Sequence, residues 1–468
     1  MRTQHQDTAT EQPPPQTELF ERSVPQVGLL SRIRSTTGQQ ARELWLGALG
    51  RVPGLSNVVN RPEARPLRSS SVRMFRWGQA PYGTAEKPES LAEIPWDYIK
   101  ANEDDIPFLG LREYWYPALK SGQLRHNESR PVTLLGDNIV LFRAADGTAR
   151  ALENRCPHRS ALLSLGQVGA YEAGTITCRY HGMTFDGEGS CVAYLADGPD
   201  SPAIGKVRAR SYPVEEHAGI IWVYMGHNQP SSLLDSQPHA RSVLGQRSLI
   251  VQHMELPFSH LNMLDNATDL THVGCLHRTC LLFGSQRPFG EIECEERGPT
   301  GLRASYTQAG EHPGKLHIDH VEWYLPNVVY HAPGDLGAGL GEGWFWFVPR
   351  DVGSFTAWLI IGGDQSGGPV RRAVTTRLAR ILTGSLFSRR LGPTTLVSCL
   401  LGGDVPMQAS QGRVARWDTD RLARGDRSVA RARRMVQEAH RAEVAERKRR
   451  DSGRSARTTK RGARAEQS

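Results

Sequence analysis

The sequence contains no apolar run that reaches the roughly 20 residues of a membrane-spanning helix. Its first residues, Met1–Glu21, have neither the basic start nor the apolar stretch of a secretory signal. The seven cysteines are an odd number and are scattered along 468 residues, unlike the disulfide framework of a small secreted domain. These absences predict a cytoplasmic protein without a membrane span.

A dinucleotide-binding fingerprint is also missing. Gly334–Gly343 (GDLGAGLGEG) is rich in glycine, but its spacing does not fit G-x-G-x-x-G and no helical pattern follows it. Aromatic, strand-like runs flank this segment on both sides, so we expect a hairpin loop there. The sequence therefore gives no indication that this protein binds a nicotinamide or flavin cofactor.

Positive charge is concentrated at the C-terminal end of the chain. The net charge is +8, and Arg441–Ser468 alone holds ten Lys or Arg residues against four Asp or Glu residues. The remaining sequence is close to neutral, so the basic character does not indicate a nucleic-acid-binding domain. We expect residues 447–468 to form a solvated, disordered basic tail.

Length and composition predict a folded protein with more than one domain. The hydrophobic fraction is 38% and the charged fraction is 23%, which is typical of a chain with a sizeable core and some polar extensions. Residues 1–106 are predicted to form a partly disordered N-terminal extension, because the first 25 residues are rich in Gln, Thr and Pro. We place a β-rich domain at residues 107–229 and a larger α+β domain at residues 230–446.

Short apolar runs between turn signals indicate the β-rich domain. Pro131–Arg143 holds two such runs around Gly136-Asp137-Asn138, which predicts a β-hairpin. Gly219–Gly226 (GIIWVYMG) predicts a buried strand. No helical pattern alternates with these runs, so we expect antiparallel sheets.

Two loops of this domain carry residues that commonly bind metals. The first loop contains Cys156 and His158 as C-x-H, and the second contains Cys178 and His181 as C-x2-H. Two thiolates and two imidazoles suit one tetrahedral zinc ion. They also suit a 2Fe–2S cluster with both cysteines on one iron and both histidines on the other, and we favour the cluster. A purely structural role is the least expected, because ligand-type residues recur in two matched loops.

A second constellation lies in Asp265–His277 (DNATDLTHVGCLH), with the pattern N-x2-D-x2-H-x4-H. Two imidazoles and one carboxylate, with other positions open, are typical of a non-haem Fe(II) site that activates oxygen. Asp269 and His272 are three residues apart and share a face of the predicted helix. His277 does not lie on that face, so we expect the helix to bend or end near Gly274. The plain alternative is two ordinary histidines on a helix.

In combination, CPHR…CRYHG followed by DNATDLTH…H resembles the oxygenase component of Rieske non-haem iron oxygenases, over about residues 108–440. The resemblance is strongest to the aromatic ring-hydroxylating and demethylase-like branch. It implies an α+β protein in which an N-terminal all-β Rieske 2Fe-2S domain precedes a helix-grip catalytic domain, built from a curved antiparallel sheet and helices. A Rieske-type electron-transfer protein without catalysis is the alternative, but it would not need His272 and His277.

The resemblance also implies roles for individual residues. It assigns four ligands to the 2Fe–2S cluster, three to a mononuclear Fe(II), and two positions beside that iron. The implied cluster ligands are Cys156, His158, Cys178 and His181, and the implied iron ligands are His272, His277 and Asp404. The two positions beside the iron are Asn266 and Asp269, and Asp269 would link one subunit's cluster to the neighbour's iron. We prefer Asp404 as the downstream carboxylate because GGDVPMQASQ resembles the family's acidic residue before a helix that ends in Gln. Asp418, Asp420 and Asp426 are rivals in a more highly charged segment.

The partners and the reaction follow from the same resemblance. It implies O2, a small aromatic or polycyclic substrate, and electrons from a ferredoxin or an NAD(P)H-dependent reductase. Electron transfer between subunits implies a head-to-tail homotrimer. The expected product is a hydroxylated or demethylated molecule, with an oxidative cyclisation of secondary metabolism as the alternative. Trp323, Trp344, Phe345 and Trp346 are candidates for the wall of an apolar substrate pocket or for the core of the sheet.

Overall fold

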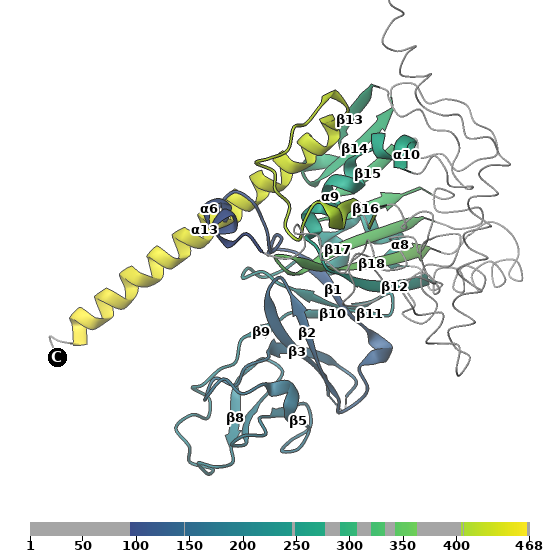
Figure 1. Ribbon diagram of the computed structural model, residues 1–468. Coiled ribbons are helices and arrows are strands. Elements are labelled where there is room, and N and C mark those ends of the chain that lie inside the picture. Colours follow the sequence, from purple (N-terminus) through teal and green to yellow (C-terminus); the bar gives the residue numbers. More distant parts are fainter. Residues whose placement is uncertain are drawn as a thin grey trace, which may run out of the picture.

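The computed structural model describes the chain from Ile94 onward, with several gaps. The described residues are 94–144, 146–245, 249–276, 291–306, 320–332, 342–362, 404–405 and 407–465. Residues 1–93, His277 and most of the glycine-rich segment lie outside this part of the chain. The described residues form two β-rich regions, of which the second is covered by helices (Figure 1).

The first region begins with two small antiparallel sheets. One has three strands in the order β1-β11-β10, and the other has four strands in the order β2-β3-β4-β9. Their bounds are Trp115–Lys120 (β1), Ser129–Leu134 (β2), Asp137–Arg143 (β3), Ala149–Glu153 (β4), Ser211–Tyr212 (β9), Val214–His217 (β10) and Ile220–Tyr224 (β11). The expectation of short antiparallel strands without intervening long helices is confirmed here.

The predicted hairpin connects β2 to β3, but its turn lies one residue earlier than expected. Leu134 pairs with Asp137, so Leu135 and Gly136 are the turn residues, with φ values of 51° and 81°. Positive φ at both central residues is the turn geometry that matches the twist of the strands, and glycine tolerates it best. Asp137 therefore belongs to β3, where its carboxylate pairs with Arg112.

A third small sheet carries the two loops with cysteine and histidine. Its order is β5-β6-β7-β8, with bounds Gln167–Val168, Ile176–Thr177, Met183–Phe185 and Cys191–Tyr194. Phe185 of β7 packs in a core of its own with Phe142 of the neighbouring strand β3 and with Leu163, which follows the first loop. The sheet lies at one end of the molecule (Figure 1).

The second region is a seven-stranded antiparallel sheet. Its order is β12-β18-β17-β16-β15-β14-β13. The bounds are Leu249–Leu256 (β12), Ile292–Glu296 (β13), Gly301–Tyr306 (β14), His320–Tyr324 (β15), Val328–His331 (β16), Gly343–Asp351 (β17) and Ser354–Gly362 (β18). β16 and β17 are neighbours and pair antiparallel, as a hairpin across the glycine-rich segment requires.

Helices cover one face of this sheet. α9 (His260–Thr268) packs on β15 and β17, and α13 (Arg427–Ala465) packs on α9 and β13. α10 (Thr271–Leu276) follows α9 directly. Further helical segments are α6 (Trp96–Asn102), η2 (Ser121–Gln123), η3 (Leu163–Leu165), α7 (Leu233–Ser236), η4 (Pro238–Ala240), α8 (Arg241–Leu244), η5 (Gly298–Thr300) and η6 (Arg424–Asp426). Residues 404–405 and 407–410 are helical as well.

The two faces of the seven-stranded sheet are buried against different partners, because side chains alternate along each strand. On β17, Trp344 and Trp346 pack with residues of β1 and β11 from the first region. Phe347 and the partly buried Phe345 pack on the opposite face, with α9, as does Trp323 of β15. Of the four aromatic candidates for a substrate pocket, Trp344 and Trp346 therefore belong to the core between the regions.

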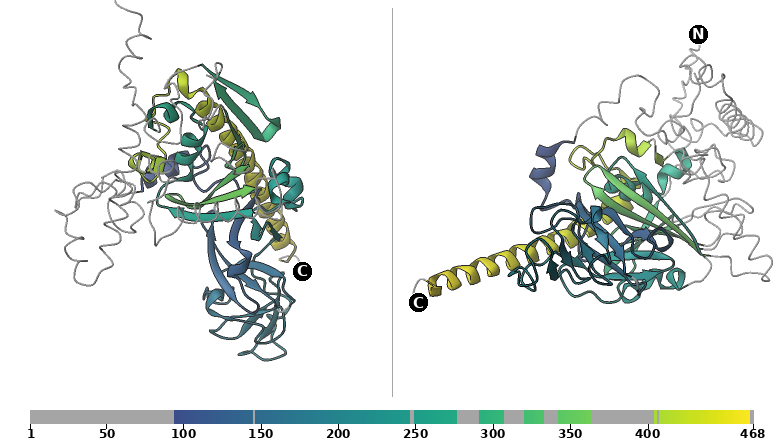
Figure 2. Two further views of the ribbon diagram at one scale, coloured as in Figure 1. Left: turned by 90° about the vertical axis from the view of Figure 1, so that its right-hand side faces the viewer. Right: turned by 90° about the horizontal axis from the view of Figure 1, so that it is seen from below.

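Helix α13 corrects the prediction for the C-terminal tail. It is 39 residues long and runs to Ala465, so the expectation of disorder is wrong for residues 447–465. Arg, Lys and Ala favour helix formation, and no proline interrupts this segment. Its C-terminal part projects away from the body of the molecule (Figures 1 and 2). No described helix is both long enough and apolar enough to cross a bilayer.

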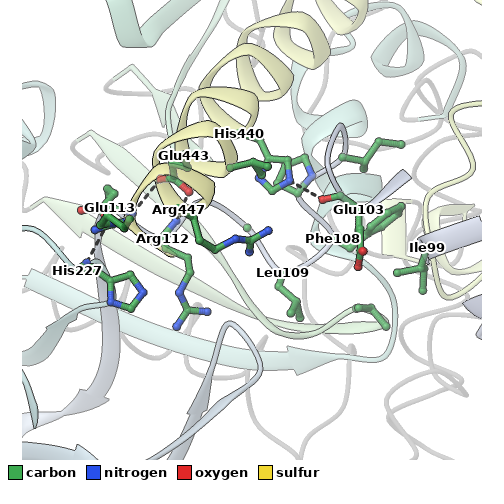
Figure 3. A pocket seen from close by; sticks show the side chains of 16 residues that line it. Ile99, Glu103, Phe108, Leu109, Arg112, Glu113, His227, His440, Glu443 and Arg447 are labelled. Atoms are coloured by element: carbon green, nitrogen blue, oxygen red, sulfur yellow. Dashed lines mark hydrogen bonds and ion pairs between the residues drawn. The ribbon is translucent and has the colours of Figure 1, made fainter. Parts of the chain in front are cut away.

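The segment before the first strand is also part of the fold. Ile99 of α6 and the following Ile106 and Phe108 are buried in the core that contains α9. An imidazole N–H of His440 in α13 donates to the carbonyl of Glu103 at 2.9 Å (Figure 3). Residues 94–106, which the sequence assigns to a partly disordered extension, are therefore packed against the second region.

Candidate functional site

The first metal-ligand loop follows β4. The N–H of Cys156 donates to the carbonyl of Ala161 at 2.8 Å, and the N–H of Ser160 donates to the carbonyl of Cys156 at 2.8 Å. Ser160 has a φ of 59°, in the left-handed region that tight loops use. Cys156 is buried and His158 is exposed, so the loop turns one ligand-type side chain inward and the other outward.

The second loop connects β6 to β7. The N–H of Cys178 donates to the carbonyl of Met183 at 2.8 Å, and the N–H of Gly182 donates to the carbonyl of Cys178 at 2.9 Å. Gly182 has a φ of 73°, and a Cβ at this position would lie 2.6 Å from Cβ of Leu195. Both the backbone conformation and this close approach require the glycine that ends the CRYHG motif.

The two loops bring their ligand-type side chains together. The ring centroids of His158 and His181 are 4.7 Å apart. Cys156 and Cys178 are buried free thiols; burial raises the pKa of Cys156 to about 11, and the neighbouring Cys178 adds to the shift. Nδ1 of His181 is buried and has no hydrogen-bond partner among the described residues. Two adjacent thiols and an unpartnered imidazole nitrogen beside a second imidazole fit a Rieske 2Fe–2S cluster.

Aromatic residues support both imidazoles. The ring centroid of Tyr180 lies 3.8 Å from that of His181, and the hydroxyl of Tyr194 lies 3.3 Å from Nε2 of His158. Burial lowers the pKa of His181, and the nearby His158 and Arg159 lower it further. A neutral imidazole is the form that binds a metal, so this environment favours the ligand state of His181.

The surface around these loops is apolar and basic. Large apolar side chains are exposed in these loops or next to them: Leu162, Leu165, Tyr180 and Leu195. Arg155, Arg159 and Arg179 are exposed in the same loops. Clustered exposed apolar side chains are typical of a surface that binds another protein, and the arginines favour an acidic partner.

The second constellation does not form one continuous helix. α9 ends immediately before Asp269, and α10 begins at Thr271, so the break precedes His272 instead of lying near Gly274. Asp269 occupies the break. Its Oδ1 accepts hydrogen bonds from the N–H and the hydroxyl of Thr271, both at 2.7 Å, which satisfies a free backbone donor at the start of α10.

His272 is oriented toward a carboxylate from a distant part of the chain. Its Nδ1–H donates to the carbonyl of Asp269 at 2.7 Å, and its Nε2 lies 3.3 Å from Oδ1 of Asp404. The side-chain amide of Asn266 donates to the same oxygen at 3.2 Å, across 138 positions of sequence. Asp404 is 8% exposed. The structure thus brings together four of the predicted residues, in a site that is largely shielded from solvent.

The charges at this site favour a bound cation. Burial lowers the pKa of His272, but the hydrogen bond and charge of Asp404, together with Asp269, raise it above its ordinary value. An imidazole and a carboxylate in contact share a proton when no metal is present. A divalent metal displaces such a proton when it binds, so the pair fits two ligands of a mononuclear metal.

The rival carboxylates have other partners. Asp418 and Asp420 form ion pairs with arginines, and Asp426 accepts a backbone N–H just before α13. Asp404 is the candidate that contacts His272. Asp404 therefore remains the predicted carboxylate ligand, and its contact with His272 is the observation that supports it.

No group of three or more His, Cys, Asp or Glu side chains arranged to hold one metal ion occurs among the described residues. A Rieske cluster needs only two protein ligands on each iron, so the first constellation does not require such a group. At the second constellation, the predicted third ligand His277 lies outside the described residues.

Sequence patterns did not identify a buried ion pair next to this constellation. Arg433 of α13 contacts Asp265, the residue before Asn266 in α9. The single acidic residue of α9, and an arginine beside the buried Met435 and Val436, were the available signals. Neither residue can be recognised from the sequence as the partner of the other, because 168 positions separate Asp265 from Arg433.

Comparison with known protein families agrees with the first constellation. Residues 114–211 match the model of the Rieske [2Fe-2S] domain. The chain carries a Rieske domain. This match confirms the expectation of a 2Fe–2S cluster in preference to a zinc site.

Curated relatives of this Rieske protein include oxygenase subunits. That of 3-chlorobenzoate-3,4-dioxygenase from Comamonas testosteroni is 37% identical over 188 residues, which are 38% of this chain and 42% of the relative. That of 5,5'-dehydrodivanillate O-demethylase from Sphingobium sp. is 31% identical over 265 residues, 52% of this chain and 60% of the relative. The chain therefore spans about half the length of the curated relatives it matches.

Solved structures extend the likeness to the whole fold. The terminal oxygenase of carbazole 1,9a-dioxygenase from Nocardioides aromaticivorans IC177 has a TM-score of 0.57 and 22% identity, and the match covers 73% of this chain and 97% of that one. An oxygenase–ferredoxin complex of carbazole 1,9a-dioxygenase gives 0.59 at 19% identity, over 75% and 96%. The predicted fold, an all-β Rieske domain followed by an α+β helix-grip domain, is confirmed, and so is the resemblance to Rieske oxygenase components.

Proposed function

We propose that this Rieske protein is the oxygenase component of a non-haem iron system. It would use O2 and externally supplied electrons to hydroxylate or demethylate an aromatic or polycyclic substrate. The contact of His272 with Asp404, with Asn266 on the same oxygen, carries the proposal. A protein that only transfers electrons has no use for a second set of metal ligands in another domain. Two relatives are a ring dioxygenase and an O-demethylase by name, which supports this class.

Two metal groups are required for this function. The residues that would hold the 2Fe–2S cluster are Cys156, His158, Cys178 and His181. Those that would hold the mononuclear Fe(II) are His272, His277 and Asp404, two imidazoles and a carboxylate with positions left open. When bound, the cluster delivers single electrons and the iron activates O2 beside the substrate.

Asp269 and Asn266 act on these ligands. The carbonyl of Asp269 accepts the Nδ1 proton of His272, which fixes the tautomer that presents Nε2 to a metal. Its carboxylate Oδ2 also lies 3.7 Å from Nδ1 of His272. We assign Asp269 the link between the iron site of one subunit and the cluster of the next, and Asn266 the orientation of Asp404.

A homotrimer would bring a cluster close to each iron site. Within one chain, the small sheet β5–β8 lies at one end of the molecule, and α9 and α10 lie on the far side of the seven-stranded sheet (Figures 1 and 2). A short electron route then has to come from a neighbouring copy. A head-to-tail ring satisfies this for every subunit at once.

The apolar and basic surface around the cluster loops supports a protein electron donor. Several similar solved structures are oxygenase–ferredoxin complexes of carbazole 1,9a-dioxygenase. We infer that a ferredoxin, reduced by an NAD(P)H-dependent reductase, is the donor. Cysteines that are free in the described residues are typical of a reducing compartment, so we place the protein in the cytoplasm.

The substrate would lie between the sheet and α9. The partly buried Phe345 faces this side of the sheet, and a flat apolar side chain suits an aromatic ring. Trp323 is on the same side but is fully buried in the core. Trp323 donates its indole N–H to Asn327 at 3.2 Å, which fixes the plane of the ring. Trp344 and Trp346 are on the opposite face and are left out of this assignment.

Anaerobic purification, iron and sulfide analysis, and EPR of the dithionite-reduced protein test the proposal. About three irons and two sulfides per chain, with a rhombic Rieske signal, are expected for a cluster plus a mononuclear site. Product formation from aromatic substrates, with ferredoxin and reductase present, would complete the evidence.

Other results would contradict the proposal in identifiable ways. Zinc without sulfide would refute the cluster itself. A Rieske signal with only the two cluster irons, and no uptake of added Fe(II), would leave an electron carrier. Uptake of one Fe(II) per chain on reconstitution would restore the oxygenase interpretation.

A further inference from the structure

One arginine of α13 joins three segments near the proposed iron site. Nε of Arg433 donates to Oδ1 of Asp265 at 2.9 Å, and Nη2 donates to Oδ2 of Asp265 at 2.7 Å. Nη2 also donates to Asp420 at 2.5 Å, and the guanidinium lies 4.9 Å from the ring centroid of Trp417. A two-pronged contact from a planar guanidinium fixes the direction of the carboxylate as well as its distance.

This ion pair is largely shielded from water. The side chains of Arg433 and Asp265 are 10% and 15% exposed, and the indole N–H of Trp417 donates to Oδ2 of Asp265 at 3.1 Å. Burial raises the pKa of Asp265 to about 6. Burial opposes the charge on Arg433, but Asp265 and Asp420 outweigh it and raise the pKa of Arg433. Both groups are charged at neutral pH, and each depends on the other because water cannot replace the missing partner.

Asp265 lies on the helix that carries the proposed site. The next residue, Asn266, donates to Asp404, and successive residues of a helix point about 100° apart. Through its contact with Arg433, Asp265 fixes which side of α9 faces α13. This orientation of the helix directs the amide of Asn266 toward Asp404. A rotation of α9 about its own axis would change both contacts together.

α9 is too short to hold its own orientation. It has nine residues, and isolated helices of this length are unstable in water. Besides Asp265, it is held by Asn262, whose amide donates to the carbonyl of Gln408 at 3.1 Å. α9 leads directly into Asp269, whose carbonyl orients His272. The geometry of both sides of the His272–Asp404 contact thus depends on how α9 is held.

We propose that Arg433 is a positioning residue for the mononuclear iron site, which acts through Asp265 and α9 on Asn266, Asp404 and His272. The inference rests on the proposed function, because it requires a metal at His272 and Asp404. It assigns part of the site to the C-terminal helix, downstream of every proposed iron ligand. Removal of a side chain that hydrogen-bonds a metal ligand changes metal affinity by about 10- to 100-fold. Arg433 acts on such a side chain, Asn266, from one step further out, so the lower end of this range is expected.

Titration of the full-length holoprotein with Co(II), after a mild chelator has removed the mononuclear iron, tests this inference. High-spin Co(II) EPR reports the geometry of the filled site, and the Rieske EPR signal reports the state of the cluster domain. The variants are Arg433→Met, Arg433→Lys and Asp265→Asn. The matched control is Arg431→Gln, which removes a more exposed ion pair with Glu296 from the same helix.

We expect Arg433→Met to weaken Co(II) binding about tenfold, with an altered Co(II) signal and an unchanged Rieske signal. Arg433→Lys keeps the charge but loses the planar fork, so its affinity should lie between those of Arg433→Met and wild type. Arg431→Gln should bind Co(II) as the wild type does.

Folded Arg433→Met or Asp265→Asn protein with wild-type Co(II) affinity and signal would overturn the inference, because Arg433 would then only stabilise the fold. If Arg433→Met does not fold, Asp265→Asn and Arg433→Lys decide by the same criterion. Wild-type protein that binds no Co(II) would refute the proposed iron site itself, which separates that failure from the failure of the inference.

Discussion

Helix α13 also contacts the start of the Rieske domain, through the carboxylate of Glu443 (Figure 3). One oxygen accepts the N–H of Arg112 at 2.9 Å, and the other accepts the N–H of Glu113 at 3.0 Å. Burial raises the pKa of Glu443, so the two amides lie where water is scarce. Glu443→Ala leaves both amides without an acceptor, and we expect it to detach this end of the domain from α13.

The free-energy cost of Glu443→Ala depends on the two lost hydrogen bonds and on the cavity beside them. Each bond to a carboxylate contributes about 1.5–3 kcal/mol, so a dry site would lose about 3–6 kcal/mol. A cavity of about 210 Å³, lined by Glu443, Phe108 and Leu109 among others, adjoins the contact. It is large enough to admit water, which would satisfy part of the loss. We therefore expect a local cost of about 2 kcal/mol.

Amide hydrogen exchange at Arg112 and Glu113 measures this cost at the site itself. A local opening that becomes about 2 kcal/mol easier speeds exchange by about 30-fold. Glu443→Gln keeps one acceptor oxygen and should show a smaller effect. Glu446→Ala is the control, since Glu446 is exposed on the same helix. Equal exchange rates in Glu443→Ala and Glu446→Ala would show that the carboxylate does not hold these amides.

Three further outcomes follow. Gly182→Ala forces positive φ on alanine and places its Cβ against Leu195, so the purified variant should lose the visible absorption of the cluster, and full retention of that absorption would contradict the loop geometry. Trp346→Ala removes a buried ring whose N–H donates to Gln237 at 3.0 Å and should lower the unfolding free energy by about 3–5 kcal/mol; urea denaturation measures it, and a loss under 1 kcal/mol would be inconsistent with a core position. His260 is fully buried, and burial lowers its pKa to about 3. The neutral imidazole therefore contributes fully to the free energy of unfolding above the unfolded pKa of about 6.5. This contribution is lost as pH falls toward 3, and about 2 kcal/mol of it is gone at pH 5. The free energy of unfolding of His260→Gln should fall less than that of wild type between pH 7 and pH 5. Parallel curves of unfolding free energy against pH for the two proteins would contradict the lowered pKa of His260.

Local patterns were sufficient for the elements whose residues are close in sequence. The C-x-H and C-x2-H loops were predicted because each places its two ligand residues within four positions, where turn geometry alone sets their separation. The β2–β3 hairpin was predicted for the same reason, although the turn lies at Leu135 and Gly136. Turn type depends on φ at two residues, and a glycine next to Asp and Asn allows more than one register.

The chain ends were predicted less well, because composition was used in place of packing. Residues 94–106 are held by Ile99, Ile106 and Phe108 in the core with α9, a contact across more than 150 positions that no local pattern contains. Residues 447–465 continue a helix that begins at Arg427. A highly charged segment can be helical where a packed helix precedes it, since elongation is far easier than nucleation.

The sequence by itself predicted the chemical identity of both proposed metal centres, because thiolates, imidazoles and carboxylates select their metals by residue type and spacing. Which carboxylate meets His272, and what holds it there, depended on tertiary structure. Asp404 reaches the histidine through the packing of α9 on distant segments, and Arg433 reaches Asp265 only because α13 crosses the same helix. Alternation along β17 likewise assigned Trp344 and Phe345 to opposite faces. Such contacts form between residues far apart in the chain, so their partners are chosen by the shape of the fold and not by any neighbouring sequence.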